Sequence, residues 1–110
     1  MNLKTIIIKE AFAVKLTAEE DNKEVGRAFL YILKNDLHKE SFGFLEDVFV
    51  EEAYRSKGIG KQLVLKTIEE AKAQGCYKLI CTARTFKGEV HGFYEHMGFK
   101  RWGYEFRINF

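Results

Sequence analysis

The chain has 110 residues, which is enough for one domain with a hydrophobic core and too few for two. Hydrophobic residues make up 46% of the chain and charged residues 31%, as in an ordinary soluble globular protein. The net charge of +2 comes from both signs scattered along the chain, which argues against nucleic acid or an anionic membrane as the main partner.

Three strands are predicted in the first half of the chain. Residues 5–16, 25–33 and 42–50 are rich in β-branched and aromatic side chains. Polar stretches at residues 17–24 and 34–41 separate them and predict turns. Because the connections between successive strands are short, we expect an antiparallel meander.

The hydrophobic period changes in the second half. Apolar residues spaced by three and four predict a helix over residues 60–74, which Gly75 would end. A short apolar strand at residues 78–82 follows, and we expect it to be parallel to the third strand because a helix separates the two. A second helix over residues 89–97 precedes a final strand at residues 100–110, where apolar and polar side chains alternate. The predicted fold class is α/β, a single-domain mixed β-sheet flanked by helices in the order β-β-β-α-β-α-β.

Cysteine usage and the first residues bear on the cellular compartment. Cys76 and Cys81 lie at the two ends of a predicted strand, on opposite faces and about 16 Å apart. That separation is too large for a disulfide, so we expect reduced thiols. The first ten residues hold three isoleucines followed by charge, too short an apolar run for a signal peptide or a spanning helix, so we expect a cytoplasmic protein. The three histidines are scattered, and no metal-ligand spacing is present.

A basic, glycine-bearing loop joins the third strand to the first helix. The first N–H groups of a helix have no internal partner, and the helix dipole adds partial positive charge there. Gly58 and Gly60 let the main chain bend so that successive N–H groups point toward a ligand, while Arg55 and Lys57 add full positive charges. The loop is neither a Walker A loop nor a Rossmann fingerprint. It predicts a site for a phosphate or pyrophosphate.

Two motifs resemble one known family. The run Arg55-Ser56-Lys57-Gly58-Ile59-Gly60 resembles the R/Q-x-x-G-x-G/A motif with which GNAT-superfamily N-acetyltransferases bind the pyrophosphate of acetyl-CoA. The second predicted helix is similar to the family's A-x-x-F-Y-x-x-x-G-F element, with Val90 where alanine is common. The resemblance covers roughly residues 42–110 and implies a single GNAT-like acetyltransferase domain over residues 1–110, with the acyl-CoA N-acyltransferase fold and acetyl-CoA (coenzyme A) as co-substrate.

The resemblance also implies a donor site. In the family, the main chain of the strand before the loop pairs with the pantetheine arm like an added strand. An N–H of that strand, here that of Val50, would polarise the thioester carbonyl. The implied cofactor-binding residues are Val48, Phe49, Val50, Arg55, Ser56, Lys57, Gly58, Ile59, Gly60 and Lys61.

Three residues are candidates for catalysis. Tyr94 matches the family's tyrosine and would protonate the leaving thiolate; the alternative is an aromatic that only packs. Glu46 resembles the family's base position and Asp47 is the second choice. Either carboxylate would alternatively face solvent, act through water or attract a cationic acceptor. We read His91 as structural, paired across the helix surface with Glu95.

Two functions remain open. The first is an N-acetyltransferase in which a primary amine, on a protein, a peptide or a small molecule, attacks acetyl-CoA directly. The alternative is a non-catalytic acyl-CoA-binding sensor or assembly subunit. Typical family members insert two helices between the first and second strands, but only residues 17–24 fill that place here, so the acceptor side is open or a partner closes it. The aromatic final strand is a candidate homodimer surface, with a packed edge as the alternative.

Overall fold

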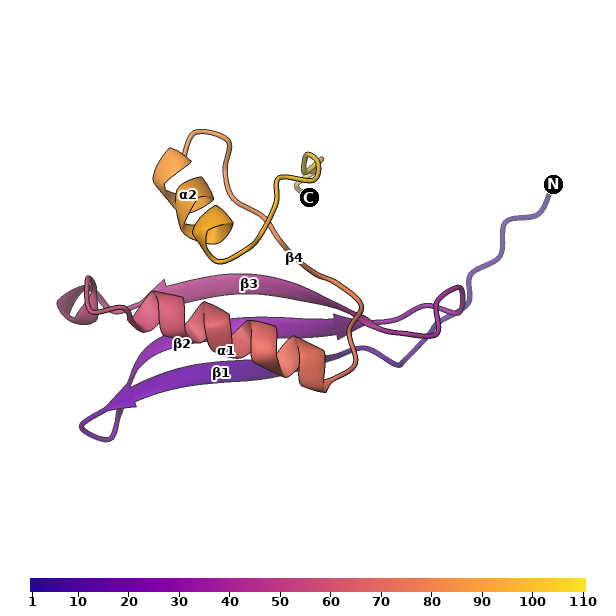
Figure 1. Cartoon of the computed structure of the whole chain (residues 1–110). Coiled ribbons are helices and arrows are strands. Elements are labelled where there is room, and N and C mark those ends of the chain that lie inside the picture. Colours follow the sequence, from indigo (N-terminus) through magenta and orange to yellow (C-terminus); the bar gives the residue numbers. More distant parts are fainter.

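The computed structural model describes residues 1–110. The chain folds into a single four-stranded sheet with two α-helices and one short 3₁₀ helix (Figure 1). The elements, in chain order, are β1 (Phe12–Glu20), β2 (Lys23–Leu33), β3 (Phe42–Val50), the 3₁₀ helix η1 (Glu52–Tyr54), α1 (Ile59–Ala73), β4 (Leu79–Cys81) and α2 (Gly88–His96). The strands lie in the order β1-β2-β3-β4. β1, β2 and β3 pair antiparallel and β4 is parallel to β3, which confirms the predicted meander and the mixed sheet.

The first strand begins and ends later than predicted. Asp21 and Asn22 have φ angles of 53° and 62° and join β1 to β2 in a two-residue turn. Two left-handed residues match the twist of the flanking strands, so the hairpin closes there. Most of the polar stretch predicted as a turn is therefore strand. Its charged side chains lie in an exposed hairpin end, where the sheet tolerates them.

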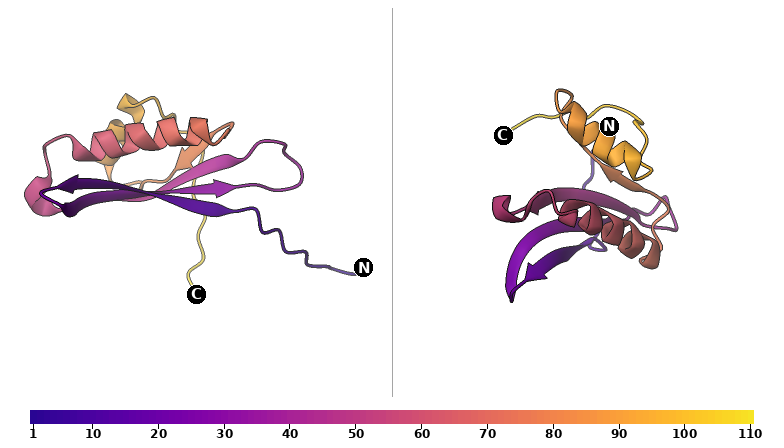
Figure 2. Two further views of the ribbon diagram at one scale, coloured as in Figure 1. Left: turned by 90° about the horizontal axis from the view of Figure 1, so that it is seen from below. Right: turned by 60° about the vertical axis from the view of Figure 1, so that its left-hand side comes forward.

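The core lies between α1 and one face of the sheet. Ala28 and Leu30 of β2 and Leu45 of β3 are buried there. The residues of α1 buried against the sheet are Leu63, Val64, Thr67 and Ala71. The buried Thr67 hydroxyl donates to the Leu63 carbonyl oxygen at 2.8 Å, so no buried side-chain polar atom is left without a partner. Both helices lie on the same side of the strands (Figure 2).

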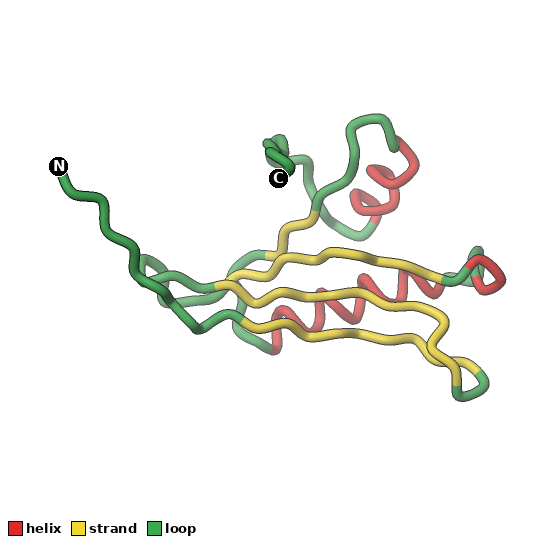
Figure 3. The backbone as a smooth tube through the Cα atoms, turned by 180° about the vertical axis from the view of Figure 1, so that it is seen from behind, coloured by secondary structure: helices red, strands yellow, loops and turns green.

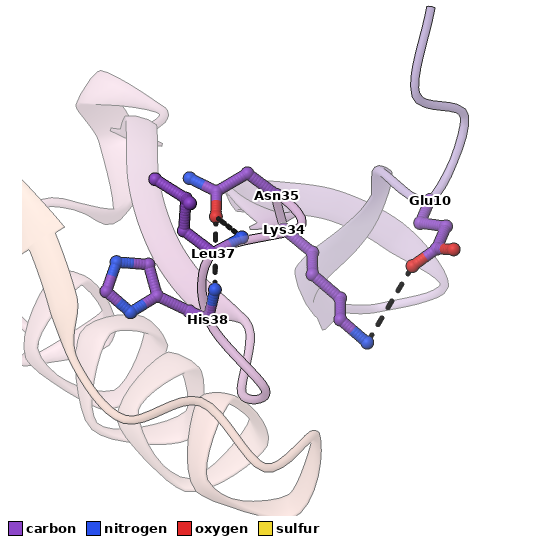
Figure 4. Close-up of polar contacts among 5 residues, drawn as sticks. All are labelled: Glu10, Lys34, Asn35, Leu37 and His38. Atoms are coloured by element: carbon purple, nitrogen blue, oxygen red, sulfur yellow. Dashed lines mark hydrogen bonds and ion pairs between the residues drawn. The ribbon is translucent and has the colours of Figure 1, made fainter.

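The connection between β2 and β3 is the turn predicted from the polar residues 34–41. The Asn35 side-chain oxygen accepts hydrogen bonds from the N–H groups of Leu37 at 2.9 Å and His38 at 3.3 Å (Figure 4). An asparagine that bonds its own following backbone is a common way to close such a turn. Lys34 at its start lies 3.7 Å from the Glu10 carboxylate.

The predicted final strand is wrong. Residues 100–110 pair with no strand and run as an irregular segment beyond α2, and residues 1–11 likewise lie outside the sheet (Figure 3). Alternation of apolar and polar residues is a local signal, whereas a strand forms only where a neighbour supplies hydrogen-bond partners. This chain leaves residues 100–110 without such a neighbour.

The cysteines lie differently from the prediction. Cys76 precedes β4 in a loop, where its N–H donates to the Ala71 carbonyl oxygen, so the two cysteines do not bracket a strand. Both thiols are free and half-buried. Neither helix has the length and apolar character needed to cross a membrane, and no cluster of His, Cys, Asp and Glu side chains gathers to hold a metal ion.

Candidate functional site

The second half of β3 has a free edge. Pairing between β3 and β4 ends at Leu45 and Cys81, and the chain after β4 turns away toward α2 (Figure 1). The Glu51 N–H donates to the Val25 carbonyl oxygen of β2 at 2.8 Å. Because main-chain groups alternate along a strand, those of Val48 and Val50 then point to the free edge. Apart from the Val50 carbonyl oxygen, which accepts from Arg55, the structure thus offers unpaired main-chain groups at Val48 and Val50, two of the positions predicted for the pantetheine arm.

A bulge separates the two halves of β3. Asp47 has a φ of 54°, and the pairing register with β2 shifts between Arg27 and Phe29. A bulge inserts one extra residue, bends the strand and ends regular pairing, which accounts for the separation from β4. A non-glycine residue in this conformation costs free energy, and such positions cluster at functional sites.

The predicted carboxylates lie at this bulge. Glu46 and Asp47 are exposed, and Glu46 pairs with Phe29 on the sheet face opposite α1. Partial desolvation raises the pKa of Tyr31, and the negative charges of Glu46 and Asp47 raise it further. Tyr31 therefore stays protonated beside these carboxylates.

The loop after η1 leads into α1, whose N-terminus has no side-chain cap. Ser56 and Gly58 have φ angles of 66° and 80°, and no side chain caps α1. The first main-chain bond at this end runs from the Gln62 N–H to the Gly58 carbonyl oxygen at 3.1 Å. The N–H groups of Ile59, Gly60 and Lys61 therefore have no helical partner and are open to an anion.

An open cavity of about 450 Å³ joins the loop to the free edge of β3, a size typical of ligand sites. Its lining residues are Val48, Phe49, Val50, Tyr54, Arg55, Ser56, Gly58, Ile59, Gly60, Lys61 and Phe93. The structure brings together all the predicted cofactor-binding residues except Lys57, whose ammonium lies 5.2 Å from the Tyr54 ring. Tyr54 and Phe93 were not among the predicted binding residues; Phe93, expected in the core, packs against it and also lines this cavity.

Arg55 is held in place at the mouth of this cavity. Its Nε–H donates to the Val50 carbonyl oxygen at 2.8 Å, and its guanidinium lies 5.5 Å from the Phe49 ring. These contacts leave the terminal N–H groups of the guanidinium free for an anion. A Cβ atom built on Gly60 would lie 3.8 Å from Val50 and 3.9 Å from Phe93, so Gly60 keeps the passage between them open.

Tyr94 is not among the residues that line the cavity. Its ring packs edge-on against Phe93 and Phe99, with centroid separations of 5.3 Å and 5.4 Å. Burial, with a smaller contribution from Cys81, raises the pKa of Tyr94 to about 12. The hydroxyl is therefore protonated throughout the physiological range, as a proton donor must be.

The surroundings of two more residues, Cys81 and His91, bear on their chemistry. Burial raises the pKa of Cys81 to about 11, which disfavours the thiolate that a nucleophilic cysteine needs. His91 Nε2 donates to the Arg84 carbonyl oxygen at 2.6 Å, and Glu95 pairs with Arg101 at 2.9 Å. The predicted pairing of His91 with Glu95 is therefore wrong, but the structural role given to His91 fits.

We expect the protein to lose stability in alkali, partly through Tyr94 and Cys81. Both groups have a raised pKa in the folded state, so the unfolded chain releases these protons first, from about pH 9 to 10 upward. The stability that these two protonated groups contribute to the fold is complete below that range and is lost progressively until the pH passes about 12. Thermal unfolding followed by circular dichroism would show a smaller alkaline fall for Tyr94→Phe with Cys81→Ser than for the unmodified protein. An unchanged pH profile would contradict the burial of these two groups.

Known proteins match both the sequence and the fold. The model of the acetyltransferase (GNAT) family matches residues 5–99. Glucosamine 6-phosphate N-acetyltransferase 1 of Oryza sativa subsp. japonica is 42% identical over 59 residues, 52% of this chain and 33% of that protein. Two solved structures, glucosamine-6-phosphate N-acetyltransferase from Arabidopsis thaliana and an acetyltransferase from Trypanosoma brucei, are each 29% identical, with TM-scores of 0.80 and 0.79. They cover 89% of this chain, and it covers 67% and 69% of theirs. The chain spans 33–44% of the length of the first curated relatives it matches.

Proposed function

The chain belongs to the GNAT acetyltransferase family, and from that premise we propose that it transfers an acetyl group from acetyl-CoA to a primary amine. The observation that carries the proposal is the cavity where the uncapped start of α1 meets the unpaired edge of β3. One end suits a diphosphate and the other suits an extended amide-bearing chain. Coenzyme A has those two parts in that order.

The phosphate end is formed by main-chain N–H groups and cations. The free amides of Ile59, Gly60 and Lys61 lie at the positive end of a 15-residue helix. Arg55 and Lys61 line the same cavity and supply charge. Three main-chain N–H groups that are adjacent in the sequence fit a compact anion, so we assign this end of the site to the pyrophosphate.

The other end follows β3. Val48 and Val50 present main-chain groups to the free edge, where the pantetheine arm would add as a strand does. The Val50 N–H is the donor placed to polarise the thioester carbonyl and to stabilise the oxyanion that forms on attack. The Val50 carbonyl oxygen is already bound by Arg55, which fixes this stretch before any ligand arrives.

Transfer needs two proton movements. The amine nitrogen forms a bond to the acetyl carbon and loses a proton, for which Glu46 is the base, directly or through water, with Asp47 beside it. The carbon–sulfur bond breaks, and Tyr94 supplies the proton to the sulfur. The protonated Tyr31 phenol lies on the same sheet face as the Glu46 carboxylate, opposite α1.

An amino sugar phosphate is the first acceptor to test. Several relatives carry the name glucosamine 6-phosphate N-acetyltransferase. Glu46 and Asp47 form an exposed acidic pair that suits a cationic amine, and no element covers it on this face. The same exposure suits a flexible peptide or protein amine, which is the second class to test.

A non-catalytic acyl-CoA-binding module is the second candidate function. Tyr94 does not line the donor cavity, and the helices that usually wall the acceptor site have no counterpart between β1 and β2. A module that binds acyl-CoA without turnover needs neither a tyrosine in the donor cavity nor helices that wall an acceptor site. The two candidates share the donor site and differ only in chemistry.

An assay of thiol release separates the two candidates. The protein is incubated with acetyl-CoA and, in turn, glucosamine 6-phosphate, a polyamine and a peptide with a free amine. Release that depends on one amine supports the transferase. A melting shift without release on any amine supports the module, since ligand at about a hundredfold its dissociation constant stabilises by about 2.7 kcal/mol. Absence of both would overturn the donor site itself.

A further inference from the structure

One face of β2 carries a row of side chains to which the proposed chemistry gives no role in binding. Arg27, Phe29 and Tyr31 alternate with the buried side chains of this strand, so they lie on the sheet face opposite α1. All three are half-buried, although no helix covers this face (Figure 3). Arg27 pairs with Phe49 of β3, and Phe29 pairs with Glu46. The row therefore runs directly beside the bulge of β3.

Arg27 is a positioned cation without an anion. Its guanidinium carbon lies 4.6 Å from the centroid of the Phe49 ring, the shortest cation–ring distance in the chain. Arg27 takes part in no ion pair and donates no side-chain hydrogen bond. Contact with a ring holds a guanidinium in place and leaves its N–H donors free. These donors are therefore available to a ligand.

The position of Arg27 relates it to both parts of the proposed active site. Phe49, which the guanidinium contacts, also lines the donor cavity. Glu46 holds the diagonal cross-strand position on the same face, and Cα atoms so placed are roughly 7–8 Å apart. A guanidinium and a carboxylate at this spacing, on a face that no helix covers, suit a ligand that carries both a positive and a negative group.

We propose that Arg27 selects an acceptor that carries an anionic group, a phosphate or a carboxylate, on the same molecule as its primary amine. The amine lies at Glu46 and Asp47, and the anion accepts hydrogen bonds from the Arg27 guanidinium, whose planar fork matches both anions. The inference rests on the proposed function for the amine and adds a second point of recognition. Lys15 of the neighbouring strand does not replace Arg27, because it is already paired with Glu24 at 3.0 Å.

Matched pairs of amines test the anion directly. Titration calorimetry on the protein saturated with coenzyme A measures acceptor binding and needs no acetyl transfer. One pair is glucosamine 6-phosphate and glucosamine, and the other is phenylalanine and phenylalaninamide. We expect the anionic member of one pair to bind on the order of tenfold to a hundredfold more tightly than its partner, and the difference to shrink as salt is added. The pair that shows the difference identifies a phosphate or a carboxylate. Equal affinities within both pairs would overturn the proposal.

Arg27→Gln is the test variant and Arg84→Gln the control. Arg84 is also an arginine without an ion pair, but it is exposed in the loop between β4 and α2. We expect Arg27→Gln to abolish the difference within the pair and to leave the affinity for the member without the anion within about twofold, whereas Arg84→Gln changes neither. A difference that survives Arg27→Gln would overturn the proposal.

A second variant covers the case in which Arg27→Gln does not fold, as circular dichroism would show. Arg27→Lys keeps the charge and loses the planar fork, so it is expected to retain only part of the difference within the pair. An undiminished difference in Arg27→Lys would then contradict recognition by the guanidinium.

The outcome can be told apart from that of the proposed function. A difference that Arg27→Gln abolishes, without acetyl transfer to any amine, would support the anion site and refute the transferase. Acetyl transfer to both members of each pair, with KM values that are equal within the pair and unchanged in Arg27→Gln, would support the transferase and overturn the anion site.

Discussion

Gly60→Val is expected to lower the affinity for acetyl-CoA by about a hundredfold or more while leaving the fold intact. Gly60 sits between Val50 and Phe93 in the lining of the donor cavity, and a Cβ there would already lie 3.8 Å and 3.9 Å from them. The first carbon is accommodated, and the two further methyl groups fill the passage and cover the free amides at the start of α1. A hundredfold loss corresponds to about 2.7 kcal/mol of binding free energy.

The substitution separates binding from folding, because it is expected to lower the affinity for acetyl-CoA but to favour the helical conformation of α1. The φ of Gly60 is not among the positive values in the chain, and valine has a higher helix propensity than glycine. Gly92→Val in α2 is the matched control, since a Cβ there meets nothing within 4 Å. Titration calorimetry with acetyl-CoA measures the affinities of both variants. Equal affinities for Gly60→Val and the unmodified protein would remove the donor site from this cavity.

The fold was predictable from the sequence wherever the signal was local. The structure places α1 at Ile59–Ala73 and α2 at Gly88–His96, each one residue from the predicted start and end. Helix boundaries follow from adjacent residues, such as Gly58 and Gly75 with their positive φ angles. Strand boundaries depend on partners far along the chain. The first strand was therefore displaced, and residues 100–110 carried a strand pattern without a strand.

The candidate site shows the same difference between local and long-range signals. The proposed phosphate end is one contiguous loop, so its composition was enough to predict which residues would lie together. Glu46 and Asp47 were noticed as charges within an apolar strand, but the bulge at Asp47 and the proximity of Tyr31 arise from pairing with β2. Phe93 packs against the core and also lines the cavity, and nothing in a helix sequence shows which aromatic side chain faces a cavity.

Tyr94→Phe is expected to lower kcat for acetyl transfer by about a hundredfold or more and to leave KM for acetyl-CoA within about twofold, the range typical of losing a general acid. Tyr94 does not line the donor cavity, so donor binding does not depend on its hydroxyl. The ring itself is retained in phenylalanine, so its edge-on packing on Phe93 and Phe99 is preserved. The substitution therefore removes one hydroxyl and nothing else.

Tyr77→Phe is the control, because Tyr77 is 47% exposed and lies outside the donor cavity. Steady-state rates with saturating amine, measured for both variants, give kcat and KM separately. With a pKa of about 12, Tyr94 is a weaker acid than a thiol of pKa about 8.5, so proton transfer to the thiolate is uphill and Tyr94 acts through a hydrogen bond to the charge that builds on the departing sulfur. The loss of the Tyr94 hydroxyl should therefore lower kcat most for thioesters with a poor leaving group and least for an activated thioester. A kcat for Tyr94→Phe equal to that of Tyr77→Phe would reduce Tyr94 to a packing residue and leave the proton to solvent.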